Sequence, residues 1–306
     1  MSLQRKAFKL SNGLTIPAVA YGVGTTWFKF GSPEVNKPLV DAVKYALDHG
    51  FSHVDGALAY GTDAEIGAVL ASVDRSSIHL TNKYWGTLGE HKSPQPNPYE
   101  SLKVQLKDLK TDYVDLYLLH HPFFSKDVQG YDLKEAWKFM EQLVDEGLAK
   151  SIGVSNFAVG DLKSVLESAR IKPVINQIEF SAYMQNQTPG IVKFCQENNI
   201  LVEAYSPLAP LFQAEDNGDL TEYTDKVAKK YSKTAGQVML RWVLQNGILP
   251  VTTSKNETRI SQLNDLFDFE LSSEEFSKIT ELGAKHSTHR MYWKEVYGTF
   301  DIDTKP

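Results

Sequence analysis

The sequence predicts one (β/α)₈ barrel domain over residues 1–306, and two observations favour this fold. Eight β-forming runs alternate with segments of helical hydrophobic period along the chain, the pattern of a strand–helix barrel of this length. The alternative, a doubly wound sheet, would carry a glycine-rich phosphate turn after its first strand. Gly22-Val23-Gly24 begins such a turn, but Trp27 stands where the third glycine belongs, so this fingerprint fails.

The first expected element is an N-terminal β-hairpin, because Asn12-Gly13 is a favoured two-residue turn and apolar residues flank it. The eight barrel strands are then expected at 18–23, 53–55, 78–83, 114–119, 151–155, 174–179, 201–205 and 249–253. Helices are expected between them at 39–49, 64–72, 99–109, 133–146, 159–169, 189–198 and 220–231, with one more after the last strand.

Local signals support several of these boundaries. Pro38 lies near the start of the first helix and Gly50 just past its end, the usual asymmetry of helix termini. Residues 234–237 and 272–275 have the pattern of capping boxes. The C-terminal tail at 286–306 is rich in aromatic residues (Tyr292, Trp293, Tyr297 and Phe300), so we expect it to fold back over a pocket.

Composition restricts the class of protein. A net charge of −6 and a pI near 5.8 argue against a general nucleic-acid binder, which would carry a basic face. Cys195 is the single cysteine, which excludes an internal disulfide framework and a multi-cysteine zinc site. The N-terminus has no secretory pattern, and no apolar run is long enough to span a membrane. We therefore expect a cytoplasmic protein with no membrane or nucleic-acid partner and no metal.

Four polar residues stand at or just after the ends of three consecutive expected strands: Asp55, Tyr60, Lys83 and His120. All strands of a parallel barrel open on the same face at their C-terminal ends, so these side chains are expected to meet in one pocket. A tyrosine has an unperturbed pKa of about 10, and a neighbouring ammonium lowers it. Tyr60 beside Lys83, itself held by Asp55, is therefore a candidate proton donor to a carbonyl oxygen, with a neutral His120 orienting the substrate.

A structural ion-pair network is the alternative explanation of the same residues. Asp55, Lys83 and Tyr60 could stabilise a barrel without reacting, and the His120-His121 pair could be one core and one exposed histidine. Their order along the chain and their position at strand ends favour an active site. A tyrosine acid needs an incoming hydride to complete a reduction, and nicotinamide cofactors supply hydride.

The later strands offer groups suited to such a cofactor. Ser155, Asn156 and Gln177 carry hydroxyl and amide groups that suit a carboxamide, and Tyr205 offers a ring face for stacking. A second set follows the last strand at the start of a helix, a natural place for a phosphate: Ser254, Lys255, Asn256 and Arg259. An ordinary polar helix N-terminus is the alternative for this set.

Six segments together resemble the aldo-keto reductase family over nearly the whole chain. They are FSHVDGALAYG at 51–61, LTNK at 80–83, YVDLYLLHHP at 113–122, IGVSNF at 152–157, VINQIE at 174–179 and VEAYSPL at 202–208. VTTS at 251–254 and NQTP at 186–189 look most similar to the fungal dicarbonyl and α-keto-amide (conjugated polyketone) reductase branch. The resemblance implies a (β/α)₈ barrel, a monomer, NADPH bound without a Rossmann fold, and a small carbonyl substrate.

The resemblance also implies roles for individual residues. Tyr60 matches the general acid, Lys83 the residue that lowers its pKa, Asp55 the partner of Lys83, and His120 the substrate-orienting histidine. The implied cofactor residues are Gly24, Thr25, Thr26, Asp55, Ser155, Asn156, Gln177, Tyr205, Ser206, Leu208, Thr253, Ser254, Lys255, Asn256 and Arg259. The implied substrate pocket is lined by Trp27, Trp85, His121 and Trp293.

Two positions depart from the family pattern. His121 stands where many members carry tryptophan, so a more polar pocket is expected and the usual aldehyde preference is in doubt. Thr253 stands where many members carry a lysine for the 2′-phosphate of NADPH. Lys255 and Arg259 can compensate for that lysine, so we expect NADPH to be preferred over NADH.

Other functions fit the sequence less well. A glycosidase barrel would use paired carboxylates such as Glu179 and Glu203, but Glu203 lies inside its strand and is interpreted as a buried partner. A short-chain dehydrogenase would use Tyr99 and Lys103, which lie on an amphipathic helix with no glycine-rich turn at the N-terminus. A serine hydrolase would need a second glycine after Ser155, where Phe157 stands. A binding module that senses the nucleotide without turnover is the remaining alternative, and it would be expected to lose Tyr60, Lys83 or His120.

Overall fold

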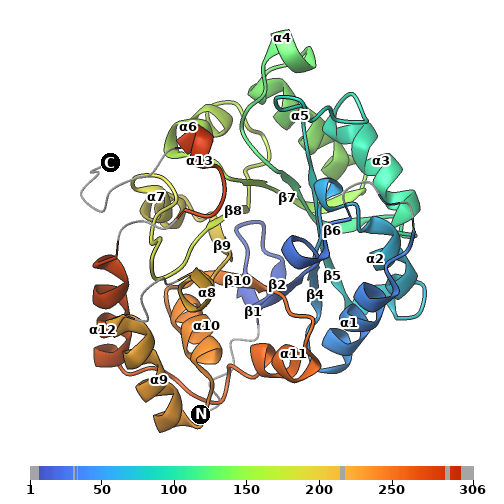
Figure 1. The fold of residues 1–306 in the computed structure, drawn as a ribbon. Coiled ribbons are helices and arrows are strands. Elements are labelled where there is room, and N and C mark those ends of the chain that lie inside the picture. The colour runs from blue at the N-terminus through green and yellow to red at the C-terminus, as the bar shows by residue number, and fades with distance from the viewer. Residues whose placement is uncertain (1–6, 30–31, 33, 214–217, 287–289, 298–306) are drawn as a thin grey trace.

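The computed structural model describes residues 7–29, 32, 34–213, 218–286 and 290–297. Eight parallel strands close into a barrel in the order β10-β3-β4-β5-β6-β7-β8-β9, and helices surround it (Figure 1). The strands are β3 Ala20–Gly22, β4 His53–Asp55, β5 His79–Tyr84, β6 Val114–Leu119, β7 Ala149–Ser155, β8 Ile175–Glu179, β9 Leu201–Tyr205 and β10 Leu249–Thr252. The predicted (β/α)₈ barrel is confirmed.

The predicted hairpin is also present. β1 Ala7–Lys9 pairs antiparallel with β2 Thr15–Pro17, and Gly13 takes a φ of +88° in the turn. Leu10 and Ile16 are buried, and they belong to an apolar cluster that includes Leu116 on β6. The hairpin is seen through the centre of the strand ring in Figure 1. It therefore closes one mouth of the barrel with apolar side chains and leaves the other mouth for polar chemistry.

The helices pack their apolar faces on the outside of the strands, where the larger core lies. They are α1 Lys37–Asp48, α2 Asp63–Leu70, α3 Pro98–Asp108, α4 Lys126–Gln129, α5 Leu133–Asp145, α6 Val159–Leu166, α7 Ile191–Glu197, α8 Ala209–Gln213, α9 Asp219–Tyr231, α10 Ala235–Gln245, α11 Glu257–Asn264, α12 Ser273–Ala284 and α13 Lys294–Tyr297. Both predicted capping boxes are formed, by Thr234 with Gln237 and by Ser272 with Glu275. None of these helices is long and apolar enough to cross a membrane.

The connection between β9 and β10 differs from the prediction. One helix was expected there, at 220–231, but the chain forms α8, α9 and α10. Helix α10 was missed although its cap at Thr234 was recognised. Its middle turns are buried on nearly every side, including Met239, Leu240, Trp242 and Val243. The helix nonetheless keeps an amphipathic period, so the capping box at Thr234 and the apolar run that follows it were sufficient signals for a helix here.

Candidate active site

The C-terminal ends of the first strands bring the four expected catalytic side chains together. Lys83, near the end of β5, has its ammonium 2.7 Å from Asp55 Oδ1 on β4. The same ammonium donates to Gly56 O at 2.8 Å and to Tyr60 Oη at 3.5 Å. Each of the three N–H groups of the Lys83 ammonium thus has one acceptor. Lys83 is 0% exposed and Asp55 is 2% exposed, so this ion pair is buried and its attraction is screened little by solvent.

Tyr60 lies in the short 3₁₀ segment Leu58–Tyr60, which neighbouring chain segments hold in place. The backbone N–H of Lys29 donates to Tyr60 O at 3.2 Å, and Lys29 Nζ is 2.8 Å from buried Glu65. Gly24 lies directly against the Tyr60 ring, where a Cβ atom would come within 2.8 Å of ring carbons. A glycine at position 24 is therefore what lets the phenol reach its place.

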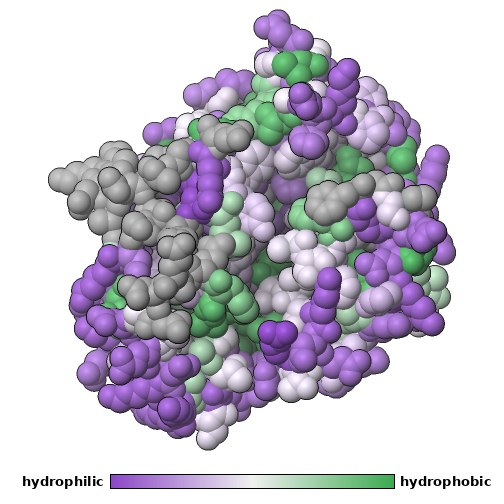
Figure 2. Space-filling view, viewed as in Figure 1, coloured by the Kyte–Doolittle hydropathy of each residue, from purple (hydrophilic) through white to green (hydrophobic). Residues whose placement is uncertain are grey.

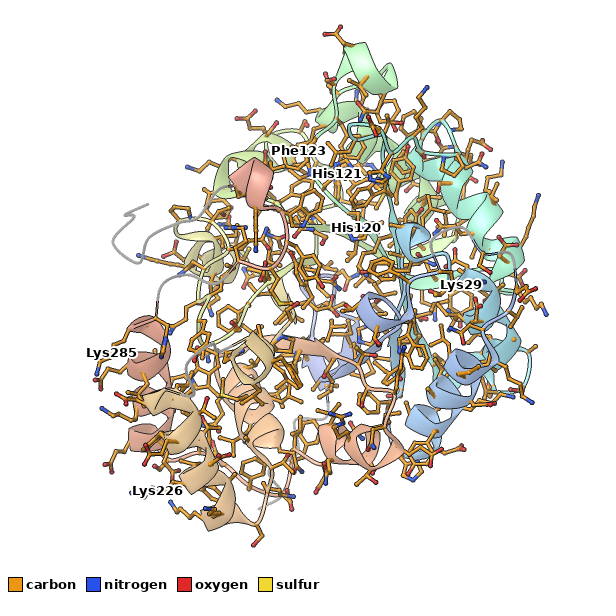
Figure 3. All side chains as sticks on the ribbon, viewed as in Figure 1. Lys29, His120, His121, Phe123, Lys226 and Lys285 are labelled. Carbon is orange, nitrogen blue, oxygen red and sulfur yellow. The ribbon has the colours of Figure 1, made fainter. Side chains whose placement is uncertain are left out.

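His120 follows the end of β6 and completes the group. Its ring lies edge-on to Tyr60, with centroids 5.8 Å apart, and edge-on to Trp85 at 5.0 Å. Figure 3 shows His120, His121 and Phe123 together near the barrel mouth, while Lys226 and Lys285 lie on the periphery. Burial, and then Lys83, lower the pKa of His120 well below its usual value. The imidazole is therefore neutral at pH 7, as expected from the sequence.

The pKa of Tyr60 differs from the expectation. Burial raises it above its ordinary value of about 10, and Asp55 adds to the rise, while Lys83 opposes it. The direction of the Lys83 effect was right, but burial outweighs it because removing a phenolate from water is costly. Burial likewise lowers the pKa of Lys83, and here Asp55 and Tyr60 more than compensate, so the ammonium is retained. Tyr60 stays protonated across the neutral range, the form that a proton donor needs.

A second layer of polar groups lies beneath these residues. Gln177 on β8 donates both amide hydrogens inward, to Asp55 Oδ2 at 2.8 Å and to Glu203 Oε2 at 3.0 Å. No described residue donates to Gln177 Oε1, and Gln177 lines the cavity described below. Burial, and then Asp55, raise the pKa of Glu203 to about 8. Glu203 is thus a buried, neutral acid at pH 7, as its position inside β9 suggested.

The expected carboxamide residues surround the cavity floor. Asn156 donates to His120 O at 2.9 Å and accepts from Tyr205 Oη at 2.8 Å, while Ser155 Oγ donates to Gln177 O at 2.9 Å. Asn156, Ser206 and Thr25 all have positive φ (63°, 55° and 51°) although none is glycine. Such backbone is costly and concentrates at functional sites, and here it follows three strand ends of one face.

The expected phosphate residues gather at the start of α11. Asn256 caps this helix by accepting from Arg259 N at 2.9 Å, and Ser254 Oγ accepts from Asn256 N at 3.0 Å. Lys255 Nζ lies 4.9 Å over the ring of Trp27, whose Nε1 donates to Thr253 Oγ1 at 3.1 Å. The helix N-terminus, two cations and two hydroxyls provide the donors that a phosphate requires.

A cavity of about 910 Å³ opens above Tyr60. Figure 2 shows its surroundings as a paler, partly hydrophobic hollow within a largely hydrophilic rim. Two of the four expected pocket residues, Trp85 and Trp293, line it. Tyr292 of the aromatic tail lines it as well, whereas the sequence had assigned no role to the other described lining residues: Phe28, Leu58, Ala59, Glu90, His91, Lys92 and Pro94. The aromatic composition of the tail was the signal that could identify Tyr292 as a cavity residue. No feature of the sequence distinguished the other seven lining residues from ordinary loop residues.

Trp27 and His121, also expected in the pocket, are not among the residues that line this cavity. Trp27 turns toward Thr253 and Lys255, and Phe28 takes the cavity side, its ring edge-on to Tyr60 at 5.0 Å. His121 is buried among aromatic rings; its Nδ1 accepts from Phe123 N at 3.2 Å and its Nε2 faces Gly86 O at 3.4 Å. Both ring nitrogens are thus used inside the protein, and the expected polarity does not reach the cavity.

The described part of the tail, residues 290–297, lies over the cavity. Trp293 stacks on Trp85 with centroids 5.7 Å apart, and Tyr292 stands edge-on to Tyr205 at 5.7 Å. Phe300, also expected in the tail, lies outside the described residues. Among the described residues, no group of three His, Cys, Asp or Glu side chains could hold a metal ion.

Comparison with known proteins finds relatives that match nearly the whole chain. The model of the aldo/keto reductase family matches residues 21–284. The chain is 48% identical to an NADPH-dependent alpha-keto amide reductase of Saccharomyces cerevisiae, over 98% of each chain. It is 38% identical to an NAD/NADP-dependent indole-3-acetaldehyde reductase of Schizosaccharomyces pombe, over 90% of this chain and 94% of the relative. The crystal structure of a Bombyx mori aldo-keto reductase in complex with NADP matches with a TM-score of 0.79 at 30% identity, over 97% and 99% of the two chains.

Proposed function

The chain belongs to the aldo-keto reductase family, and we propose that it is an NADPH-dependent carbonyl reductase in which Tyr60 is the general acid. The observation that carries this proposal is the Tyr60–Lys83–Asp55 chain, which places one buried ammonium within 3.5 Å of a phenol that faces a cavity. NADPH supplies the hydride when it is bound. Everything else required of the site is proton donation, orientation and exclusion of water.

Tyr60 donates its proton to the carbonyl oxygen as negative charge develops there. The Lys83 ammonium stabilises the phenolate that remains, and Asp55 keeps that ammonium charged. His120 orients the carbonyl. Its Nδ1 is buried with no hydrogen-bond partner among the described residues, so the neutral ring carries its proton on Nε2, where it can donate into the cavity.

The residues fit a nicotinamide cofactor. Gln177 has both amide hydrogens bound inside the protein, so its oxygen is the atom left to accept from a carboxamide. Asn156 and the Tyr205 ring line the same cavity floor. Ser254, Lys255, Asn256 and Arg259 would hold the 2′-phosphate at the start of α11, which favours NADPH over NADH. The two fungal relatives, one NADPH-dependent and one NAD/NADP-dependent, show that related chains differ in this preference.

We further propose that the substrate is an α-dicarbonyl compound, a keto ester or a keto amide. Support comes from the 48% identity to an alpha-keto amide reductase and from the cavity walls. Phe28, Leu58, Trp85 and Trp293 offer apolar contact to a flat or bulky group beside the reacting carbonyl. On the family resemblance, we also propose a monomeric cytoplasmic enzyme; sedimentation of the purified chain tests the oligomeric state.

The direct test is to follow NADPH oxidation with a panel of aldehydes, α-diketones, keto esters and keto amides. We expect turnover with the activated ketones and a kcat/KM for NADPH well above that for NADH. Equal kcat/KM for the two coenzymes would overturn the phosphate assignment. Tight NADPH binding without turnover of any carbonyl compound would instead identify a nucleotide-sensing module.

A further inference from the structure

One buried carboxylate near the cavity takes no part in the proposed chemistry. Glu179 ends β8 and is 1% exposed. Its two oxygens each accept from one of two consecutive backbone N–H groups of the tail: Oε1 from Met291 at 2.7 Å and Oε2 from Tyr292 at 3.2 Å. A single carboxylate thus accepts hydrogen bonds from two consecutive backbone N–H groups, one at each oxygen. An amide side chain of the same shape has only one acceptor oxygen.

Further bonds connect the same stretch of tail to the barrel. The Arg290 guanidinium donates to Gln187 O, and Tyr297 Oη donates to Asn156 O. Gln187 is itself tied to Glu179, because its Oε1 accepts from Glu179 N at 2.6 Å. The Glu179 carboxylate, however, binds the N–H groups of the two residues that directly precede Trp293. The bond from Tyr297 is made four residues after Trp293. Glu179 is therefore the contact best placed to fix the first cavity residues of the tail.

The anchored residues form part of the cavity wall. Tyr292 carries one of the two N–H groups bound by Glu179, and Trp293 follows it with a φ of +61°. A tryptophan with positive φ is strained and needs its surroundings to hold it. The adjoining helix α13 has only four residues and cannot supply that support by itself. The position of this wall therefore depends on the anchor.

We propose that Glu179 is a positioning residue that determines substrate specificity by anchoring the tail, so that Tyr292 and Trp293 close the cavity around bulky aromatic carbonyl substrates. This inference rests on the proposed function, since the wall selects substrates only if a carbonyl compound is reduced in this cavity. Small diketones that reach Tyr60 and His120 without touching the wall depend little on the anchor. Burial raises the pKa of Glu179, while the two N–H donors, Arg290 and Lys294 oppose that rise.

Two variants test the bonds between Glu179 and the tail, one by changing the acceptor and the other by removing a donor. Glu179→Gln keeps the shape but turns an NH₂ group toward one of the tail N–H groups. Met291→Pro removes one donor from the tail and leaves every barrel residue unchanged. Val296→Ala is the control in the same tail segment, because its side chain is 46% exposed and the two N–H groups bound by Glu179 are unchanged.

The readout compares a bulky aryl keto ester, ethyl benzoylformate, with a small diketone, 2,3-butanedione. For both anchor variants we expect kcat/KM for the aryl ester to fall about tenfold or more, mainly through KM. The diketone value and the NADPH Kd should stay within about threefold, and Val296→Ala should resemble the parent. A parallel loss for both substrates, or no loss for either, would overturn the proposal.

A second measurement does not need turnover. Trypsin cleavage after Arg290 and Lys294, followed by mass spectrometry of the NADPH-bound protein, reports release of the tail. We expect Glu179→Gln to be cleaved several-fold faster than the parent at Arg290 and Lys294. Met291→Pro should be cleaved faster at Lys294 only, because trypsin does not cut the Arg–Pro bond that this variant creates. Unchanged cleavage would refute the anchor even in an enzyme that reduces carbonyls, whereas faster cleavage in a protein without reductase activity would leave the anchor intact and refute the reductase function.

Discussion

Strand β5 presents two buried polar clusters, one on each side, through two adjacent residues. Lys83 points into the barrel and joins the cavity-side cluster of Asp55, Tyr60 and Lys83. Asn82 points outward and joins the helix-side cluster, which consists of Asp63, Asn82, Gln105 and Tyr117. Both clusters contain a carboxyl group and a phenol; the helix-side cluster is buried throughout, whereas Tyr60 of the cavity-side cluster is only partly buried.

The helix-side cluster satisfies its own groups. Asp63 accepts from Asn82 at 2.8 Å and from Gln105 at 3.3 Å, and Tyr117 Oη donates to Gln105 Oε1 at 2.5 Å. In the cavity-side cluster, the hydroxyl of Tyr60 receives one long bond from Lys83, and its ring faces open volume. Buried polar groups alone therefore do not indicate a reactive site. The two clusters differ because the Tyr60 hydroxyl remains free to donate a hydrogen bond to a molecule that enters the cavity.

The same substitution in the two phenols should give opposite results. We expect Tyr60→Phe to lower kcat by about 10³-fold, within the range for loss of a general acid, with NADPH binding close to normal. Tyr117→Phe should cost about 1–2 kcal/mol of unfolding free energy and leave kcat within about twofold. Stopped-flow reduction and urea unfolding measure the two effects. A Tyr60→Phe variant within about tenfold of the parent kcat, or roughly 1.4 kcal/mol, would remove Tyr60 from the role of acid.

Lys83→Met should affect both activity and stability. It removes the charge that stabilises the Tyr60 phenolate and leaves the Asp55 carboxylate buried without its cation. Breaking a buried pair on one side costs about 3–5 kcal/mol, and we expect kcat to fall by about 10²-fold or more. Thermal unfolding and steady-state kinetics of the purified variant measure both. A stable variant with normal turnover would show that the pair serves neither purpose.

Asp63→Asn examines the helix-side cluster through pH. Burial raises the pKa of Asp63 to about 6 from an ordinary value near 3.8, so the folded state holds the proton more tightly than the unfolded state. Its contribution to stability is therefore present at low pH and is lost as pH rises from about 4 to 6. Relative to the parent, Asp63→Asn should gain about 1–3 kcal/mol of unfolding free energy between pH 4.5 and pH 7.5. Its kcat should remain within about twofold, since no cavity group is touched.

Glu203→Gln should have only a small effect on activity and stability at pH 7. Because the carboxyl is neutral at pH 7, with a pKa of about 8, an amide of the same shape can replace it and still accept from Gln177. We expect kcat within about threefold of the parent. Because its pKa is raised in the folded state, the contribution of Glu203 to the free energy of unfolding declines as pH rises from about 4.5 to 8. The unfolding free energy of the variant should therefore increase relative to that of the parent over this interval, by at most about 1.4 kcal/mol per pH unit. A parent and variant with parallel stability profiles would show that Glu203 is ionised throughout.

Local sequence was sufficient for most of the barrel and for the residues expected to react. The strands, the hairpin at Asn12-Gly13 and the capping boxes at Thr234 and Ser272 each depend on residues close together in the chain. The positions of Asp55, Tyr60, Lys83 and His120 follow from the strands, because parallel strands in a barrel end on one face. Helix α10 was not predicted, although the capping box at Thr234 and the amphipathic run that follows it are local signals of a helix.

The sequence by itself determined a (β/α)₈ barrel with a phenol, an amine, a carboxylate and an imidazole at its strand ends. Only the tertiary structure decided that Phe28 faces the cavity in place of Trp27, that His121 is turned inward, and that burial outweighs Lys83 in the pKa of Tyr60. Side chains on regular strands alternate with a fixed period, but those on 3₁₀ turns and loops have none. Their direction, and the water they exclude, depend on packing against residues far away in the chain.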